Sequence, residues 1–285
     1  MEVINDCHVH LASSYPTEVR TKPVGVKAYK KRLQAENPSN MLRMMDKNKV
    51  DKVMLLSGTD IDEIDIVRKE TDRCAKIVKA GKKRFYGFIR INPLMPGAAD
   101  EIKRAINDLG FTGVKMLPKY WYPYEDKVQA IYRVISDLKV PILFHSGILW
   151  GHGASSMYCR PAFYECMMNY PKVKFALAHM GWPWTDECLA VAGRFSYGAG
   201  GIDNKQQMFV DITTGAPRIW KTDAMRKALS YLPHSQIFYG SDMTPWAEGY
   251  RDWVKTDFEI LHDLGATKET VKKIMYSNFF NFVKK

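Results

Sequence analysis

The segment Val3–Val9, VINDCHV, is followed by His10, so two histidines stand at the end of a short apolar run. Short runs rich in apolar and β-branched residues are typical of strands that are buried on both faces. Seven more runs of this kind follow along the chain, at Lys52–Leu56, Phe85–Ile91, Gly113–Met116, Ile142–His145, Val173–His179, Met208–Ile212 and Ile237–Gly240. The sequence therefore predicts eight buried strands.

Helical periods lie between the predicted strands. Apolar residues recur at spacings of three and four in residues 102–109, 128–138 and 225–232, which indicates amphipathic helices. Strands that alternate with helices favour a parallel sheet with crossover helices. Eight such units in 285 residues predict an α/β fold, a single (β/α)8 TIM barrel over residues 1–285. A doubly wound open sheet is the alternative, but no glycine-rich phosphate loop follows the first predicted strand.

Composition and charge exclude several classes of protein. The five cysteines form no C-x-x-C pair, which is a poor disulfide framework and fits a reducing compartment. The amino-terminal stretch does not read as a signal peptide, and no run is apolar and long enough to span a bilayer. We therefore expect a cytoplasmic protein without a membrane partner.

The formal net charge of +11 comes largely from scattered lysines. Scattered lysines are typical of a solvated surface, and no nucleic-acid-binding motif accompanies them, so we expect no nucleic-acid partner. A positive potential also favours an anionic small-molecule substrate. The sequence leaves the oligomeric state open, and a homo-oligomer is compatible with it.

Residues of metal-binding type stand at the ends of five predicted strands. Four of the seven histidines belong to this set, which comprises His8, His10, Lys115, His145, His179 and Asp242. In a barrel of parallel strands the carboxyl ends form the face that carries the active site. A set that is spread along the chain but restricted to one position in each unit therefore predicts a site at the barrel mouth.

The predicted set has the chemistry of a metal site. Because side chains alternate along a strand, Asp6, His8 and His10 are expected on the inner face of the first strand, with Cys7 and Val9 facing the helices. Imidazole and carboxylate ligands suit zinc, with manganese, iron or cobalt as alternatives. An open coordination position would activate a water molecule for attack. Asp242 would bind the ion and transfer a proton.

The chain resembles the amidohydrolase-related superfamily, the metal-dependent barrel hydrolases that also include aminocarboxymuconate-semialdehyde decarboxylase. The resemblance rests on motifs that run over nearly the whole chain: D-x-H-x-H at residues 6–10, GVKMLP at 113–118, His145, AHMG around His179, and GSD at 240–242. It implies a barrel with one or two divalent ions at its mouth.

The resemblance implies two ligand sets. In mononuclear members, the residues that correspond to His8, His10, His145 and Asp242 hold one ion, and the one that corresponds to His179 polarises water or substrate. In binuclear members, a carbamylated lysine at the place of Lys115 bridges two ions, and His145 and His179 hold the second. Because the decarboxylase branch usually carries a non-basic residue in place of this lysine and is longer, the resemblance favours hydrolysis.

Aromatic and cationic residues follow several predicted strands and are candidates for binding the substrate. Aromatic rings suit a flat or cyclic body, and arginine suits a carboxylate. Packing beneath loops and solvated charge are the competing interpretations. The candidates are Arg90, Lys119, Trp121, Trp150, Arg160, Arg218 and Trp246. The long polar segment Ala12–Pro38 is either a lid over the site or a surface excursion.

Three functions remain open at this point. The first is a metal-dependent hydrolase of a small cyclic or acyl compound, a lactone or amide that carries a carboxylate, with Asp242 and His179 as catalytic groups. The second is a metal-dependent non-oxidative decarboxylase on the same scaffold. The third is a non-enzymatic barrel. The first is the main prediction.

Overall fold

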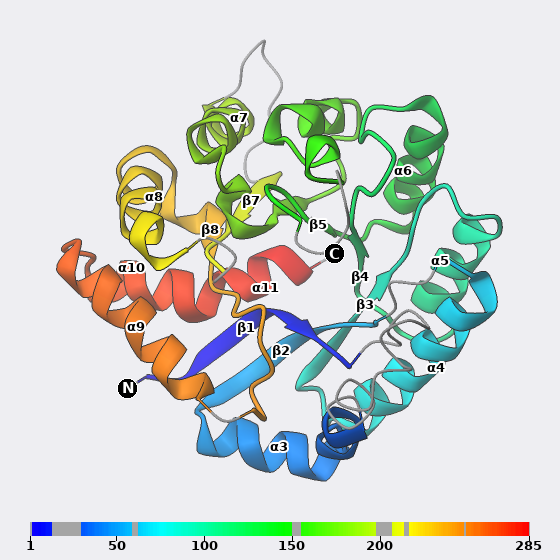
Figure 1. The fold of residues 1–285 in the computed structure, drawn as a ribbon, viewed down its shortest axis with the longest axis horizontal. Helices are drawn as coiled ribbons and strands as arrows, with labels where there is room; N and C mark the ends of the chain where they lie inside the picture. The colour runs from blue at the N-terminus through cyan, green and yellow to red at the C-terminus, as the bar shows by residue number, and fades with distance from the viewer. Residues whose placement is uncertain are drawn as a thin grey trace.

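The computed structural model describes residues 2–12, 30–58, 62–149, 155–197, 207–213, 217–247 and 249–284. Within these ranges eight parallel strands pair in chain order, and the prediction of a (β/α)8 TIM barrel is confirmed (Figure 1). The strands are β1 (Ile4–His10), β2 (Val50–Leu56), β3 (Phe85–Arg90), β4 (Gly113–Met116), β5 (Ile142–Phe144), β6 (Phe175–Leu177), β7 (Met208–Asp211) and β8 (Ile237–Phe238).

Backbone hydrogen bonds between β1 and the residues after β8 bring the two ends of the strand ring together. The Cys7 N–H donates to the Tyr239 carbonyl at 3.0 Å, and the Asp242 N–H donates to the His8 carbonyl at 2.9 Å. These two bonds place Asp242 beside the carboxyl end of β1.

Helices form an outer layer around the barrel (Figure 1). The three predicted apolar stripes fall on α5, α6 and α8, where they supply buried residues, and these predictions are confirmed. The α-helices are α3 (Pro38–Lys47), α4 (Ile64–Ala80), α5 (Ala98–Asn107), α6 (Asp126–Leu138), α7 (Thr185–Tyr197), α8 (Arg218–Tyr231), α9 (Tyr250–Asp263), α10 (Lys268–Lys272) and α11 (Asn278–Val283). Shorter helical turns are η1 (Ser155–Tyr158), η2 (Pro161–Asn169), η3 (Ala178–Gly181), η4 (His234–Gln236) and the π-helical η5 (Lys273–Ser277).

An inner apolar cluster fills the barrel beneath its mouth. Its members come from seven strands or strand ends and from α11, and include Cys7, Met54, Leu56, Phe88, Leu143, Ala176, Ala178, Phe209, Phe238, Phe279 and Phe282. The α11 helix covers the amino-terminal end, where the buried Asn278 Nδ2 donates to the carbonyls of His234 and Ile237 at 2.7 Å. Apolar side chains therefore fill the barrel below its mouth, and the predicted metal-binding residues lie at the opposite end from α11.

Side chains of β1 do not alternate as predicted, because the strand contains a β-bulge. Asp6 pairs with Val53, and Val9 pairs with Leu55. The two residues between them, Cys7 and His8, therefore stand opposite the single residue Met54 of β2. Cys7 consequently packs in the inner cluster, whereas Asp6 accepts a hydrogen bond from Tyr250 on α9. The prediction that Cys7 faces the helices while Asp6 faces inward was wrong, because a bulge shifts the period-two pattern by one residue.

The predicted strand ends differ from the observed ones most at β6. The strand stops at Leu177, because His179 and Met180 adopt left-handed backbone conformations with φ of 60° and 48°. Non-glycine residues in this region carry a conformational cost of order 1–3 kcal/mol. His179 therefore stands on a turn and not on the strand.

The segment Ala12–Pro38 lies largely outside the described residues, since only residue 12 and residues 30–38 of it are described. Residues 30–35 are helical, and Pro38 begins α3. Residues 13–29 lie outside the described ranges, so both interpretations of the segment, a lid over the site and a surface excursion, stay predictions. Among the described residues, no helix combines the length and apolar character needed to cross a membrane.

Candidate metal centre

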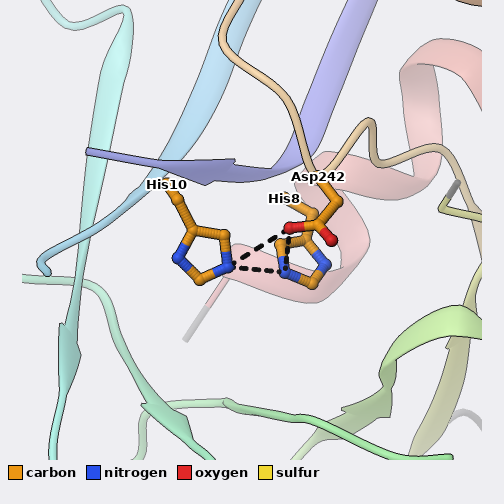
Figure 2. Close-up of side chains that lie close together, drawn as sticks. All are labelled: His8, His10 and Asp242. Atoms are coloured by element: carbon orange, nitrogen blue, oxygen red, sulfur yellow. Dashed lines mark hydrogen bonds and ion pairs between the residues drawn. The ribbon is translucent and has the colours of Figure 1, made fainter. Parts of the chain in front are cut away.

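Two histidines of β1 and the aspartate that follows β8 converge at the barrel mouth (Figure 2). The Nε2 atoms of His8 and His10 lie 3.1 Å apart. Asp242 Oδ1 lies 3.5 Å from His8 Nε2 and 3.4 Å from His10 Nε2. In the part of the chain that the structure describes, these are the residues whose metal-ligating atoms gather within 4.8 Å of one another. We call His8, His10 and Asp242 the metal triad.

The spacing of the metal triad fits a single divalent ion. With metal–ligand bonds of about 2.1 Å, these atom separations correspond to angles at the ion of about 95° to about 113°. Such angles suit three corners of a tetrahedral or an octahedral site. Two imidazoles and one carboxylate are ligands that zinc, manganese and ferrous iron accept, with further positions left open.

The backbone around Asp242 is held in an uncommon conformation by its neighbours. Asp242 has φ of 56°, in the left-handed region, and its N–H is bonded to the His8 carbonyl. The preceding Ser241 N–H donates to Asp6 Oδ1 at 2.9 Å, and the Tyr250 hydroxyl donates to Asp6 Oδ2 at 2.8 Å. Asp6 thus anchors the segment that carries the triad carboxylate.

His145 and His179 lie beside the metal triad and continue its row of imidazoles. The ring centroid of His179 lies 5.3 Å from that of His8 and 5.0 Å from that of His145. His145 Nε2 lies 3.1 Å from the Ile148 carbonyl, which occupies one of its two ring nitrogens. Neither residue belongs to the group whose ligand atoms lie within 4.8 Å of one another. Metal binding by these two residues stays a prediction.

Burial keeps the four imidazoles neutral. Desolvation lowers the pKa of each ring well below its usual value, and the positive charge of Lys115 lowers it further. Neutral imidazoles have a lone pair for a metal ion, since no proton has to be displaced. The row of rings is therefore ready to bind a cation at neutral pH. The four histidines are His8, His10, His145 and His179.

Lys115 lies at the same level of the barrel as the triad. Its side chain is buried, and its Nζ lies 3.5 Å from His8 Nε2. Burial lowers the pKa of Lys115 to about 7, against the opposing effect of the carboxylates of Asp242 and Asp211. Burial also raises the pKa of Asp242 to about 6. The amine thus borders the predicted metal position, and the carbamate remains a prediction.

Two predicted cations line one small hollow at the ends of β3 and β4. Arg90 and Lys119 border it together with Asp62 and Asn92. Arg90 pairs with Lys115 in the register of β3 and β4, and its charge lowers the pKa of both His10 and Asp242. The structure therefore brings Arg90 to the metal triad, with Lys119 close to Arg90.

Other candidate residues take different positions. Trp121 and Trp246 are buried and belong to the apolar core between strands and helices. Arg218 is exposed in the first turn of α8, where its charge acts on Asp257. Arg160 is also exposed, stacks over Trp184 and donates to Glu187. Trp150 lies outside the described residues. Substrate binding by these residues stays a prediction.

The structure adds two residues of β7 and its end that sequence analysis missed. The His8 Nδ1 atom lies 2.7 Å from Asp211 Oδ2, and both side chains are buried. Thr213 Oγ1 is hydrogen-bonded to His179 Nδ1. The sequence did hold a signal, because Phe209, Asp211 and Thr213 alternate on one face of the seventh predicted strand.

Nearly the whole chain matches a known family. A family model described as Amidohydrolase matches residues 5–278, a range that contains every member of the metal triad. The chain belongs to the amidohydrolase family. The resemblance found in the sequence is thereby confirmed. No curated protein matches this amidohydrolase in the sequence comparison.

Solved structures similar to this amidohydrolase include decarboxylases. The 2,6-dihydroxybenzoate decarboxylase from Rhizobium has a TM-score of 0.73 at 15% identity, covering 100% of this chain and 99% of that one. A dihydroxybenzoic acid decarboxylase from Polaromonas, with bound manganese and 2-nitroresorcinol, has a TM-score of 0.69 at 16% identity, covering 100% and 97%. The 5-carboxyvanillate decarboxylase from Novosphingobium aromaticivorans, also with manganese, has a TM-score of 0.67 at 14% identity, covering 100% and 96%.

These likenesses show that the fold is shared. Together with the metal triad they support a divalent-metal site in an enzyme fold, whereas the predicted preference for zinc has no specific support. The choice between hydrolysis and decarboxylation belongs to the proposal that follows.

Proposed function

We propose that this amidohydrolase-family protein is a metal-dependent non-oxidative decarboxylase of a small, flat, carboxylate-bearing compound. The observation that carries the proposal is the position of Arg90 at the end of β3, where its positive charge acts on both His10 and Asp242 of the metal triad. Three similar structures that span almost the whole chain carry decarboxylase names, and one carries 2,6-dihydroxybenzoate as its named substrate. The proposal replaces hydrolysis, the main prediction from sequence, with its alternative.

His8, His10 and Asp242 would hold the ion, and manganese is the first metal to test because it is named in two of these structures. When bound, the ion would supply Lewis-acid chemistry that polarises an oxygen of the substrate.

The remaining chemistry falls to side chains of this chain. Arg90 and Lys119 bind and orient the substrate carboxylate through charge-assisted hydrogen bonds. The buried imidazoles exclude water, and removing water from a carboxylate favours its loss as neutral carbon dioxide. His179, whose Nδ1 is bonded to Thr213, presents its other nitrogen to the substrate.

Decarboxylation breaks the bond between the carboxyl carbon and the ring and leaves an electron pair on the ring carbon. A proton must then reach that carbon. Asp242 Oδ1 faces the two triad nitrogens, so Oδ2 is the atom that carries the proton to the carbon. Solvent replaces this proton after carbon dioxide leaves, which balances the reaction without any oxidant.

Hydrolysis of a lactone or amide is the second candidate, and Lys115 is the observation that favours it. Its buried amine lies 3.5 Å from a triad nitrogen, and an unprotonated amine reacts with carbon dioxide to form a carbamate, a ligand that can bridge two metal ions. Two ions instead of one would be the signature of this alternative.

The two candidates are separated by their products. Protein loaded with manganese or zinc is incubated with hydroxybenzoates, including 2,6-dihydroxybenzoate, and with carboxylated lactones in ¹⁸O-labelled water. We expect release of carbon dioxide from an aromatic acid without entry of ¹⁸O into the ring product. Entry of one ¹⁸O atom into an opened lactone, with no carbon dioxide, would overturn the proposal. Asp242→Asn should abolish turnover, and Asp263→Asn on the exposed end of α9 is the matched control.

A further inference from the structure

The β7 strand and its end supply two buried polar side chains that contact two different imidazoles of the row. Asp211 Oδ2 lies 2.7 Å from His8 Nδ1, and Thr213 Oγ1 is bonded to His179 Nδ1. Asp211 and Thr213 are both fully buried. Neither was a candidate ligand, and their positions raise the question of what each does for its ring.

Asp211 fixes which nitrogen of His8 carries the proton. Its two carboxylate oxygens accept from two donors, since Oδ1 also accepts from the Thr213 N–H at 3.0 Å. Burial raises the pKa of Asp211, and the charge of Lys115 opposes that rise. In its ionised form Asp211 has no hydrogen to give, so the contact geometry assigns the hydrogen to His8 Nδ1. The lone pair of the neutral ring is then on Nε2, the atom that faces His10 and Asp242.

Thr213 orients His179 without fixing its proton. A hydroxyl both donates and accepts, so Thr213 holds the ring whichever nitrogen carries hydrogen. Its own backbone N–H is bonded to Asp211, so a single carboxylate sets the positions of both His8 and Thr213. The two rings therefore receive different support from one strand end.

Gly240 provides the space that this arrangement needs. A Cβ atom at position 240 would lie 2.6 Å from Asp211 Oδ1, 2.7 Å from His8 Cβ and 2.8 Å from Thr213 Cγ2. No side chain fits at these distances without displacing the carboxylate. The close approach of β8 to β7 at this level thus belongs to the same arrangement.

We propose that Asp211 and Thr213 are positioning residues with separate tasks. Asp211 holds His8 in the tautomer that binds the metal ion, and Thr213 holds His179 for contact with the substrate and away from the ion. This inference rests on the proposed metal triad, and the reaction class does not enter it.

The tautomer of His8 can be measured in the unmutated protein. Metal-free protein labelled with ¹⁵N-histidine is examined by long-range ¹H–¹⁵N correlation at pH 7.5, with His8→Gln used to assign the signal. We expect His8 to be neutral with hydrogen on Nδ1. Hydrogen on Nε2 of His8 would overturn the role of Asp211, and this measurement does not depend on the folding of any Asp211 variant.

Substitutions separate the two tasks. In Asp211→Asn the amide keeps one acceptor for two N–H donors, so one donor loses its partner. Loss of such a partner typically weakens metal binding by about 10-fold to 100-fold, and we expect a loss of this size in manganese affinity measured by competition with a chelator. Asp51→Asn is the matched control, because Asp51 stands near the amino-terminal end of β2 and accepts from Tyr276 and Lys52, not from a histidine of the row.

Thr213→Val should leave manganese affinity within about twofold of the unmutated protein, since His179 stands outside the metal triad. It should lower kcat, and Thr213→Ser, which restores the hydroxyl, should recover most of the loss. Thr71→Val in α4 is the matched control for a buried threonine.

The results of these experiments distinguish a failure of the positioning roles from a failure of the proposed metal triad. Unmutated protein that binds no manganese, zinc or iron would overturn the metal triad and this inference together. Manganese affinity that is normal in the unmutated protein and unchanged in Asp211→Asn would overturn the role of Asp211 alone. A Thr213→Val variant that loses as much affinity as Asp211→Asn would show His179 to be a ligand and would overturn the division of tasks.

Discussion

His8 uses its two ring nitrogens for two different partners. Nδ1 faces the buried Asp211, and Nε2 faces the other members of the metal triad. Burial lowers the pKa of the ring, so the ring is neutral and its metal-facing nitrogen keeps a lone pair. A residue that looks like one half of an H-x-H pair in sequence is thus defined by contacts to β7 and to the end of β8. The contact with Asp211 on one nitrogen and the contacts with His10 and Asp242 on the other are what would make His8 a metal ligand.

His10→Ala should abolish metal binding and leave the barrel folded. Its side chain stands at the mouth, a quarter exposed, and supplies one of three triad atoms. We expect less than about one tenth of the unmutated metal content, because two remaining ligands bind weakly. Metal analysis after gel filtration, with circular dichroism for the fold, measures both effects. His262→Ala, almost fully exposed on α9, should retain its metal; an unchanged metal content in His10→Ala would remove His10 from the site.

Arg90→Met should raise KM for the acid substrate by about 10-fold to 100-fold, the size of a lost charge-assisted pair with a carboxylate. The effect on kcat should be smaller, because the carboxylate contact is formed before the bond breaks. Arg226→Met on the exposed face of α8 is the control. Steady-state kinetics decide, and an equal fall in kcat with KM unchanged would argue against substrate binding by Arg90.

At the element scale, the bulge in β1 and the turn after β8 bring the triad together. The bulge places two residues of β1 opposite one of β2, so His8 points into the mouth while Cys7 fills the inner cluster. After β8, the left-handed conformation of Asp242 turns its carboxylate toward the same point. Both features are irregular, and bulges are common where a strand has to redirect a functional side chain.

A buried ion pair connects two outer helices, α8 and α9. Lys221 Nζ lies 2.5 Å from Asp257 Oδ1, and both side chains are almost completely buried. Lys221→Met would leave the carboxylate buried and unpaired, which typically costs about 3 to 5 kcal/mol. Urea unfolding should show a loss of this size. Lys227→Met is the control on the same helix as Lys221: it removes an exposed pair with Asp186 of α7 and should leave the free energy of unfolding nearly unchanged, because water screens exposed pairs.

The loss in Lys221→Met should depend on pH. Burial already raises the pKa of Asp257 despite the nearby lysine, and removing the lysine raises it further. An acid whose pKa is higher in the folded state than in the unfolded state stabilises the fold as pH falls through the folded pKa. The deficit should therefore be smaller at pH 5 than at pH 8. A deficit that is equal at both pH values would contradict an unpaired buried carboxylate.

At the scale of the whole molecule, closure of the barrel creates the site. His8 and Asp242 are separated by almost the full length of the chain, and the hydrogen bond between the Asp242 N–H and the His8 carbonyl joins them. The inner apolar cluster fills the barrel below this level, and the metal triad lies above it at the mouth. Metal binding should consequently stabilise the global fold.

Manganese at about 100 times its dissociation constant should stabilise the folded state by about 2.7 kcal/mol. For a chain of this length that corresponds to a rise in Tm of roughly 4 to 5 °C. Scanning calorimetry of metal-free protein with and without manganese measures it, and chelator should reverse the shift. His10→Ala should show no shift. A shift of the same size in His10→Ala would place the stabilising ion elsewhere.

The barrel could be predicted from sequence because its signals are local. Buried strands are continuous apolar runs, amphipathic helices repeat at 3.6 residues, and β4 even matched its predicted bounds, Gly113–Met116. The positions of His8, His10, Lys115 and Asp242 at strand ends follow from the same pattern. In a parallel barrel the carboxyl ends of all strands form one face. This property alone predicts that the four residues lie near one another at the barrel mouth.

Only the tertiary structure decided how these residues meet. The bulge at Cys7 and His8 has no signature in the strand pattern, because the register depends on the partner strand. The same holds for Asp211, whose contact with His8 joins β7 to β1 across the barrel. Local periodicity in the sequence was enough to predict His8, His10, Lys115 and Asp242 at the mouth, whereas Asp211 and Thr213 were found only in the structure. Their distances, their partners and their perturbed pKa values arise from packing between distant segments, which local periodicity does not encode.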